Sequence, residues 1–180
     1  MKLIILDRDG VINHDSDQFI KHPDEWKPIA GSLEAIARLT REGWRVVVAT
    51  NQSGLARGLF EMATLNAIHA KMHKAAMTAG GRIEAVFYCS HSAEMDCPCR
   101  KPKAGMYLEI SARYACDLND VPVIGDSLRD MQSAATVGAK AMLVKTGKGI
   151  KTLTAGGLPP GTPVFENLSD AVDHLLMPAT

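Results

Sequence analysis

The chain has 180 residues, 46% of them hydrophobic and 22% charged, which is typical of one globular domain with a sizeable core. Lys and Arg together number 20, and so do Asp and Glu, so the net charge is zero at pH 7. That balance argues against extended nucleic-acid binding, which needs a surplus of basic residues. The sequence contains neither a signal peptide nor an apolar run long enough for a membrane span. We therefore expect a soluble, cytoplasmic, monomeric protein with a single domain, residues 1–180.

Short apolar runs alternate with helical periodicity along the chain. The pattern predicts strands at 2–6, 44–50, 84–89, 121–126 and 140–145, and helices at 31–43, 62–79, 105–116, 129–139 and from about 169 onward. In the first of these helices Ser32 is available as the N-cap and Gly43 as the stop signal. Alternating strands and helices with short connections predict an α/β fold, a doubly wound parallel sheet.

Chemically reactive side chains follow three of the predicted strands. Asp7 and Asp9 come after the first, Thr50 and Asn51 after the second, and Asp126 after the fourth. Because ligands of such sheets bind at the carboxyl ends of the strands, we expect the reactive centre there.

The segment DRDGV places Asp7 and Asp9 two residues apart. Taken alone, it fits an ordinary turn as well as a catalytic pair, since Asp and Gly are common in turns. The catalytic interpretation needs a second acidic strand end to complete a site for a hard metal ion. The segment IGDSLRDM offers Asp126 and Asp130 for that purpose.

A cluster of cysteines precedes a basic segment in YCSHSAEMDCPCRKPK. Cys89, His91, Cys97 and Cys99 supply four nitrogen or sulfur ligands, which favours a closed, structural zinc site over a catalytic one with an open position. Unligated thiols in a loop are the alternative, and a disulfide is disfavoured in a reducing compartment. Cys116 lies outside the cluster, on a predicted helix, where we expect a buried apolar residue.

Four segments, DRDG, ATNQSG, CRKP and GDSLRD, occur in this order and resemble the four motifs of the haloacid dehalogenase superfamily of phosphatases. The resemblance covers nearly the whole chain and implies a Rossmann-like fold of that superfamily. The spacing of the motifs leaves no room for a cap domain. Asp7 would then be the nucleophile that forms an aspartyl-phosphate, and Asp9 the general acid and base. The carboxylates of Asp7 and Asp126 and the backbone carbonyl of Asp9 would bind catalytic Mg²⁺.

The same resemblance assigns phosphoryl stabilisation to Thr50 and Lys101, which would supply a hydroxyl and a cation to the transferring oxygens. Asp130 would orient Lys101 or the metal shell without binding the metal directly. Zinc would hold the loop that carries Arg100 and Lys101 beside the phosphate.

Two groups within the superfamily are similar in having a cysteine loop before CRKP. One removes the C7 phosphate of D-glycero-D-manno-heptose 1,7-bisphosphate, for lipopolysaccharide core precursors, and the other hydrolyses histidinol phosphate. TNQSGLARG and VKTGKG resemble the heptose group, whereas the short cysteine loop and Lys103 resemble the histidinol group. We expect the heptose activity, with histidinol phosphate as the alternative substrate.

The heptose resemblance implies a set of substrate-binding residues: Asn51, Gln52, Ser53, Arg57, Arg100, Asp15 and Ser127, with Lys148 also available for the second phosphate. The segment HDSDQF departs from the pattern of that group, and only Asp15 matches it.

Two other classes of protein remain as less favoured alternatives. A phospho-accepting receiver domain has a similar sheet but needs neither a general acid at Asp9 nor a zinc loop. A zinc-dependent nucleic-acid-binding module would explain the cysteine cluster, but the zero net charge argues against it.

Overall fold

A computed structural model describes residues 1–177 and contains one six-stranded sheet in the order β3-β2-β1-β4-β5-β6. All neighbouring strands are parallel. The strands are β1 (Lys2–Leu6), β2 (Trp44–Asn51), β3 (Ile83–Cys89), β4 (Pro122–Gly125), β5 (Lys140–Val144) and β6 (Val164–Phe165). The α-helices are α1 (Ser32–Arg41), α2 (Met62–Thr78), α3 (Gly105–Tyr114), α4 (Leu128–Thr136), α5 (Gly149–Ala155) and α6 (Leu168–Leu176), and two 3₁₀ turns are η1 (Pro23–Glu25) and η2 (Ala93–Met95). The predicted doubly wound parallel sheet is confirmed.

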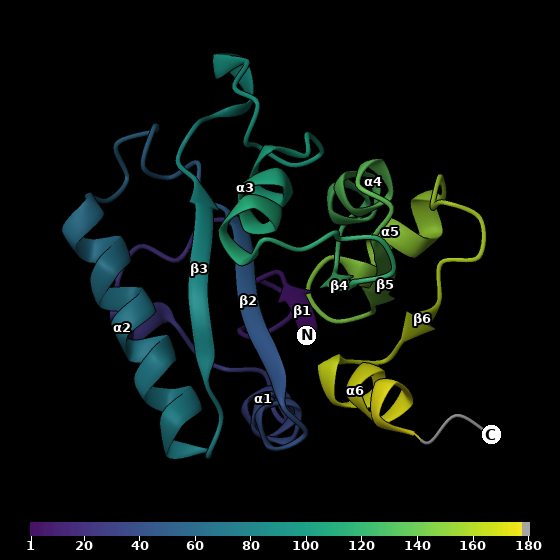
Figure 1. Ribbon diagram of the computed structural model, residues 1–180. Coiled ribbons are helices and arrows are strands. Elements are labelled where there is room, and N and C mark those ends of the chain that lie inside the picture. Colours follow the sequence, from purple (N-terminus) through teal and green to yellow (C-terminus); the bar gives the residue numbers. More distant parts are fainter. Residues whose placement is uncertain (178–180) are drawn as a thin grey trace.

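Helices cover both faces of the sheet (Figure 1). Apolar side chains of α1, α2 and α6 pack on one face, and those of α3 and α4 on the other. The sequence of β1, KLIIL, suits a central strand of the sheet. Ile4 and Leu6 pack in the apolar cluster on the face covered by α1, α2 and α6, and Leu3 and Ile5 in the cluster on the opposite face. After the exposed Lys2, every residue of β1 is apolar and buried, which is the pattern of a central parallel strand covered on both faces.

Strand order reverses between β1 and β4, because β1 leads to β2 on one side and β4 leads to β5 on the other. This is the topological switch point of a doubly wound sheet, where a crevice forms at the carboxyl ends of the strands. The backbone N–H of Asp7 donates to the carbonyl of Ile124 at 2.9 Å, which holds the ends of β1 and β4 together. The loop between β3 and α3 stands above this edge of the sheet (Figure 1).

The predicted N-cap of α1 is wrong. Gly31 caps the helix, with φ of +84°, and the Ser32 hydroxyl donates to the backbone carbonyl of Val11 at 2.8 Å. Ser32 therefore ties the helix to the segment after β1. The placement of Cys116 on a helix is also wrong, because α3 ends at Tyr114 and Cys116 is half-buried in the turn that follows.

Helix α5 and strand β6 have no counterpart in the sequence prediction. Both are short and lie around a Gly- and Pro-rich stretch, so neither has enough residues to show a period. Long-range contacts stabilise them instead. Strand β6 pairs with β5, and in α5 the Thr152 hydroxyl donates to the carbonyl of Asp126 at 2.9 Å.

The described segments contain no cap domain. Between β1 and β2 lie only η1 and α1 with their loops, and between β2 and β3 only a loop and α2. The crevice is therefore bordered by loops. Within residues 1–177, no helix is both long enough and apolar enough to cross a membrane.

Candidate active site

A cavity of about 250 Å³ opens at the carboxyl ends of β1, β2 and β4. Every site residue predicted outside the cysteine cluster lines it: Asp7, Asp9, Asp15, Thr50, Asn51, Gln52, Ser53, Arg57, Arg100, Lys101, Asp126, Ser127 and Asp130. Four segments that are distant in the sequence thus meet in one crevice, because each follows a parallel strand or leads into the helix behind it.

Three carboxylates and one lysine form the floor of the cavity. Oxygen atoms of Asp7, Asp126 and Asp130 all lie within 4.8 Å of one another. Lys101 Nζ lies 3.1 Å from Asp7 Oδ1 and 2.6 Å from Asp130 Oδ1, and it also donates to the carbonyl of Ala49 at 2.8 Å. Lys101, Asp126 and Asp130 are at most 3% exposed. The ammonium group is therefore held in place before any substrate binds.

Burial and the mutual repulsion of the carboxylates disfavour ionisation of the acidic side chains at this floor. Burial raises the pKa of Asp7 to about 7, with Asp130 and Asp9 adding to the shift and Lys101 opposing it. Burial, together with Asp7 and Asp130, raises the pKa of Asp126 to about 8. Although burial opposes it, the two carboxylates Asp130 and Asp7 raise the pKa of Lys101, so the lysine stays charged. Asp7 and Asp126 together need a further cation to be fully ionised at neutral pH.

The donor atoms here fit Mg²⁺, which prefers oxygen ligands and keeps part of its water shell. Asp126 Oδ2 accepts from the backbone N–H of Lys148 at 2.8 Å, and two glycines crowd it. A Cβ at Gly10 or at Gly147 would lie 2.0 or 2.2 Å from that oxygen, and both glycines have positive φ. The backbone thus closes around the carboxylate and fixes its direction toward Asp7.

Asp130 uses its two oxygens differently from Asp7 and Asp126. Its Oδ1 accepts from Lys101, and its Oδ2 accepts from the backbone N–H of Ser127 at 3.0 Å and from the Ser127 hydroxyl at 2.6 Å. Both oxygens are therefore already bonded. This geometry favours the predicted role in orienting Lys101 over direct metal binding.

The carboxylate of Asp9 lies at the edge of the cavity and accepts hydrogen bonds from three side chains. Arg8 donates through Nε and Nη2 at 3.0 and 3.1 Å, Asn13 Nδ2 at 2.8 Å, and Gln52 Nε2 at 2.9 Å. Burial opposes ionisation, but Arg8 and the two amides lower the pKa of Asp9. Gln52 also donates to Thr50 Oγ1 at 3.0 Å, so one amide links Asp9 to Thr50.

Asn51 has a role that the sequence did not indicate. Its side-chain Nδ2 donates to the carbonyl of Lys101 at 3.1 Å, and its Oδ1 accepts from the backbone N–H of Lys101 at 3.1 Å. The Asn51 amide is thus engaged with the CRKP backbone, which it joins to the end of β2. Its assignment to substrate binding stays a prediction.

Cationic side chains border the mouth of the cavity. Arg57, Arg100 and Lys148, which were predicted as contacts for the substrate or its second phosphate, all line the cavity, and Lys148 Nζ pairs with Asp15 at 3.2 Å. Burial, together with the nearby guanidinium groups of Arg129 and Arg57, lowers the pKa of Arg100. The rim therefore gathers several guanidinium groups that repel one another, which makes it a good site for an anion.

Some residues that line the cavity escaped the sequence analysis, Arg129 and Phe19 among them. Arg129 lines the cavity from the first turn of α4, and the only signal for it was its place inside the GDSLRD motif. Phe19 lines it from the loop after β1, with φ of +64° and the Arg57 guanidinium 6.0 Å from its ring centre. A positive φ at a Phe has no local sequence signal, so only the structure could reveal it.

The predicted zinc ligands converge at the base of the β3–α3 loop. The Sγ atoms of Cys89, Cys97 and Cys99 lie 3.1–3.6 Å apart, and His91 Nδ1 is 3.3 Å from Cys99 and 3.6 Å from Cys89. Zn–S bonds of about 2.3 Å place tetrahedral ligand atoms about 3.5–3.8 Å apart, so the cluster fits this ion. Four protein ligands leave no open position for chemistry. The cluster is consistent with structural zinc.

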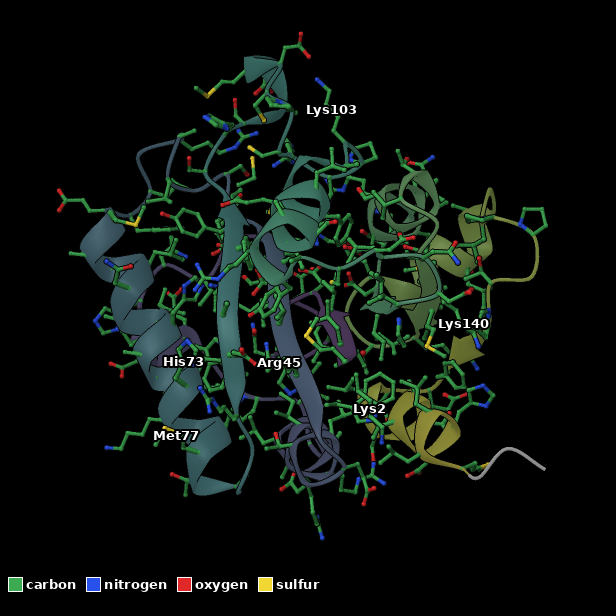
Figure 2. All side chains as sticks on the ribbon, viewed as in Figure 1. Lys2, Arg45, His73, Met77, Lys103 and Lys140 are labelled. Carbon is green, nitrogen blue, oxygen red and sulfur yellow. The ribbon has the colours of Figure 1, made fainter. Side chains whose placement is uncertain are left out.

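The loop connects this cluster to the cavity. Arg100 and Lys101 follow Cys99 directly, and Arg100 Nη1 donates to the carbonyl of His91 at 3.3 Å. Lys103, labelled near the β3–α3 loop in Figure 2, pairs instead with Asp96 on that loop and is not among the residues that line the main cavity. Lys103, one of the two features that resembled the histidinol-phosphate group, therefore lies away from the reactive centre.

Comparison with known proteins gives concordant results. A family model described as HAD-hydrolase-like matches residues 98–171. The chain is 60% identical, over 99% of its length and 100% of the relative, to a Bordetella bronchiseptica protein named D-glycero-beta-D-manno-heptose-1,7-bisphosphate 7-phosphatase. A Pseudomonas aeruginosa protein of the same name is 49% identical, with 97% of each chain covered. The chain belongs to the D,D-heptose 1,7-bisphosphate phosphatase family.

Solved structures of the family have the same fold. The B. bronchiseptica enzyme, complexed with magnesium and phosphate, superposes with a TM-score of 0.96 over 98% of each chain. The Burkholderia thailandensis enzyme is 53% identical and superposes with a TM-score of 0.79, covering 98% of this chain and 100% of that one. Membership of this family confirms the predicted superfamily, and the alternative histidinol-phosphate assignment is not favoured.

Proposed function

We propose that this protein hydrolyses the C7 phosphate of D-glycero-β-D-manno-heptose 1,7-bisphosphate and releases heptose 1-phosphate. The observation that carries the proposal is the convergence of Asp7, Lys101 and Asp126 in one crevice, in a chain 60% identical to a relative named for that reaction. The β anomer is proposed because the relatives' names specify it. Such a product suits the synthesis of heptose precursors for lipopolysaccharide.

The first chemical step is assigned to Asp7 and Asp9. An Asp7 oxygen attacks phosphorus, an aspartyl-phosphate forms, and the bond from phosphorus to the C7 oxygen breaks. Asp9 must carry a proton for this step, although Arg8 and the two amides favour its carboxylate form in the free protein. It gives that proton to the leaving oxygen, which otherwise departs as a strongly basic alkoxide. Meanwhile Lys101 and the Thr50 hydroxyl face the phosphoryl oxygens and stabilise their developing charge.

In the second step, water attacks the phosphorus of the aspartyl-phosphate, and phosphate leaves with Asp7 regenerated. Asp9, now a carboxylate, accepts the proton of the water. Mg²⁺ held by the Asp7 and Asp126 carboxylates and the Asp9 carbonyl would offset the repulsion between anionic nucleophile and anionic phosphate. Asp130 keeps Lys101 aimed at the phosphate through both steps.

The rim of the cavity supplies contacts for the phosphate that is not cleaved. Arg57, Arg100 and Lys148 were expected there, and Arg129 joins them from α4. Zinc at the cysteine cluster would hold the backbone of Arg100 and Lys101 and take no part in bond breaking. Asn51, Gln52, Ser53, Asp15 and Ser127 complete the proposed contact set, all of them lining the same cavity.

The deciding experiment compares kcat/KM for α- and β-heptose 1,7-bisphosphate and for histidinol phosphate with the Mg²⁺- and zinc-loaded protein. We expect the β-bisphosphate to be preferred. A higher kcat/KM for histidinol phosphate would overturn the proposal, and so would stable phosphorylation without turnover, which is the behaviour of a receiver domain.

Four further expectations from the sequence stay predictions: one functional domain over residues 1–180, a monomeric state, a cytoplasmic location and the lack of nucleic-acid binding. Residues 178–180 lie outside the described part of the chain. Size-exclusion chromatography with light scattering measures the oligomeric state. A salt titration of binding to DNA or RNA tests for nucleic-acid binding.

A further inference from the structure

A fully buried arginine stands behind the active site. The Arg8 side chain has 0% exposure, although its neighbours Asp7 and Asp9 both line the cavity. Its Nε and Nη2 donate to the two oxygens of Asp9 at 3.0 and 3.1 Å. Two parallel contacts of this kind fix the plane of a carboxylate as well as its position.

The third nitrogen of Arg8 reaches a residue far along the chain. Nη1 lies 3.1 Å from Nε2 of His69, which is 8% exposed and belongs to α2. A guanidinium can only donate hydrogen bonds, so His69 Nε2 must be the acceptor and the ring proton must sit on Nδ1. Burial, with the positive charge of Arg8 and the neighbouring His73, lowers the pKa of His69 to about 3, which keeps the ring neutral.

Burying the Arg8–Asp9 ion pair costs free energy of folding. Desolvating a guanidinium and a carboxylate costs several kcal/mol each in typical proteins, and an apolar pair of similar volume often serves stability as well or better. The free side of Asp9, 22% exposed, faces the cavity, while its back is held by Arg8. A buried cation that touches no substrate but holds a reacting group has a role in positioning that group.

We propose that Arg8 and His69 are positioning residues for Asp9: His69 holds the guanidinium, and the guanidinium holds the carboxyl group in line with the leaving oxygen. This rests on the proposed function, in which Asp9 donates a proton to that oxygen and later accepts one from water. Neither Arg8 nor His69 exchanges protons or touches the phosphate. Their effect is confined to the steps in which Asp9 moves a proton.

That confinement distinguishes positioning from general structural support. A sugar alkoxide is a poor leaving group and needs the proton of Asp9, whereas p-nitrophenolate leaves without one. A defect in the placement of Asp9 should therefore slow phosphoryl transfer from the heptose bisphosphate far more than transfer from p-nitrophenyl phosphate. A loosened active site would slow both transfers alike.

The experiment uses rapid-quench single turnovers of the Mg²⁺- and zinc-loaded protein with both substrates. Arg8→Met should slow phosphoryl transfer from the heptose bisphosphate by about 100-fold, the lower range for loss of a general acid. Transfer from p-nitrophenyl phosphate should change little. A burst of p-nitrophenolate should then precede slow turnover, because Asp9 is also needed to activate water, and phosphorylated Asp7 should accumulate.

A matched pair of variants tests His69. His69→Leu removes the acceptor at similar volume and should give the same pattern at about 10-fold, whereas His69→Gln keeps an acceptor oxygen and should restore most of the rate. His73, labelled in Figure 2, lies one turn further along α2, and the Nη1 contact of Arg8 is with His69 instead, so His73→Leu controls for loss of an imidazole. If thermal melting shows that Arg8→Met is unfolded, the His69 pair decides.

Three outcomes would overturn the inference: equal losses with both substrates, no loss at all, or the same loss in His69→Gln as in His69→Leu. The proposed function is tested separately by the wild-type protein and by Asp9→Asn. If the wild type does not hydrolyse the heptose bisphosphate, the proposed function fails. If it does, and Asp9→Asn gives the burst pattern but Arg8→Met does not, only the positioning inference fails.

Discussion

Lys101 Nζ lies 2.6 Å from Asp130 Oδ1, across 29 positions of sequence, and both side chains are almost completely buried. The contact joins the segment that follows the cysteine cluster to the first turn of α4. Because Asp130 also accepts from Ser127, the ammonium group is held against a fixed carboxylate. A cation placed in this way can meet a phosphoryl group without rearranging first.

Replacing Asp130 by Asn should lower kcat by about 100-fold, because Lys101 then loses its strongest charged partner and its fixed direction. The change in KM should be smaller, since Lys101 still carries its charge beside Asp7. Steady-state kinetics measures both, with Asp120→Asn as an exposed control. Equal activity of the two variants would contradict the role of Asp130 as the residue that orients Lys101.

Replacing Asp7 by Asn should abolish turnover while leaving the fold intact, since the amide has the same shape but is no nucleophile. The expected loss is at least about a thousandfold, which phosphate release measures directly. Circular dichroism and thermal melting check the fold. Appreciable hydrolysis by this variant would mean that another group attacks the phosphorus.

Magnesium should stabilise the protein more at high pH than at low pH. In the metal-free protein the pKa of Asp7 is about 7 and that of Asp126 about 8, against about 4 in the unfolded chain. The folded state therefore binds more protons between about pH 4 and pH 8, so the free energy of unfolding from this pair falls as the pH rises. Bound Mg²⁺ removes that loss.

Calorimetric melting with and without Mg²⁺ measures this effect. The gain in Tm on adding Mg²⁺ should be small near about pH 5 and largest near about pH 8. Asp126→Asn should lose most of the difference between the two pH values. A gain that is independent of pH in the wild-type protein would be inconsistent with buried carboxylates as the metal ligands.

Removing zinc should disorder the segment from Cys89 to Lys103 and reduce activity, because Arg100 and Lys101 lose their anchored backbone. Structural zinc contributes several kcal/mol or more to the folding of the segment that it binds, so Cys97→Ser should lower Tm as well as kcat. Metal analysis should find one zinc per chain, and hydrogen exchange should locate the disorder. A spectroscopic signature of zinc-bound water in the active protein would argue instead for a catalytic ion.

Substitution of Arg100 or Arg129 by Ala should impair the bisphosphate more than an aryl phosphate, because only the bisphosphate has a second anionic group for the rim. We expect kcat/KM for the bisphosphate to fall by about 10- to 100-fold in each variant, the range for a lost charge-assisted contact. Equal losses for the two substrates would place these arginines outside recognition. Arg113→Ala, on α3 and exposed, is a suitable control.

Much of the fold and site could be predicted from local patterns. The apolar runs within KLIIL and WRVVVAT are short and rich in β-branched residues, which predicts buried strands, and the reactive residues follow them directly. The ends of parallel strands meet at one edge of the sheet, so Asp7, Thr50 and Asp126 had to be neighbours once the sheet was predicted. The four predicted zinc ligands lie within eleven residues, from Cys89 to Cys99, so one loop is enough to bring them together.

Only the tertiary structure reveals the contacts between residues that are distant in the sequence. In the sequence, Arg8 is simply a charged residue between two aspartates. No local pattern indicates that the helix beginning at Met62 places His69 in contact with it. The same holds for the bonds from Asn51 to the Lys101 backbone and for Arg129 at the rim. Periodicity reports which face of an element is apolar, whereas the partner of a buried polar group depends on how whole elements pack. Sequence thus determined the sheet and the reactive groups, and packing decided how those groups are held.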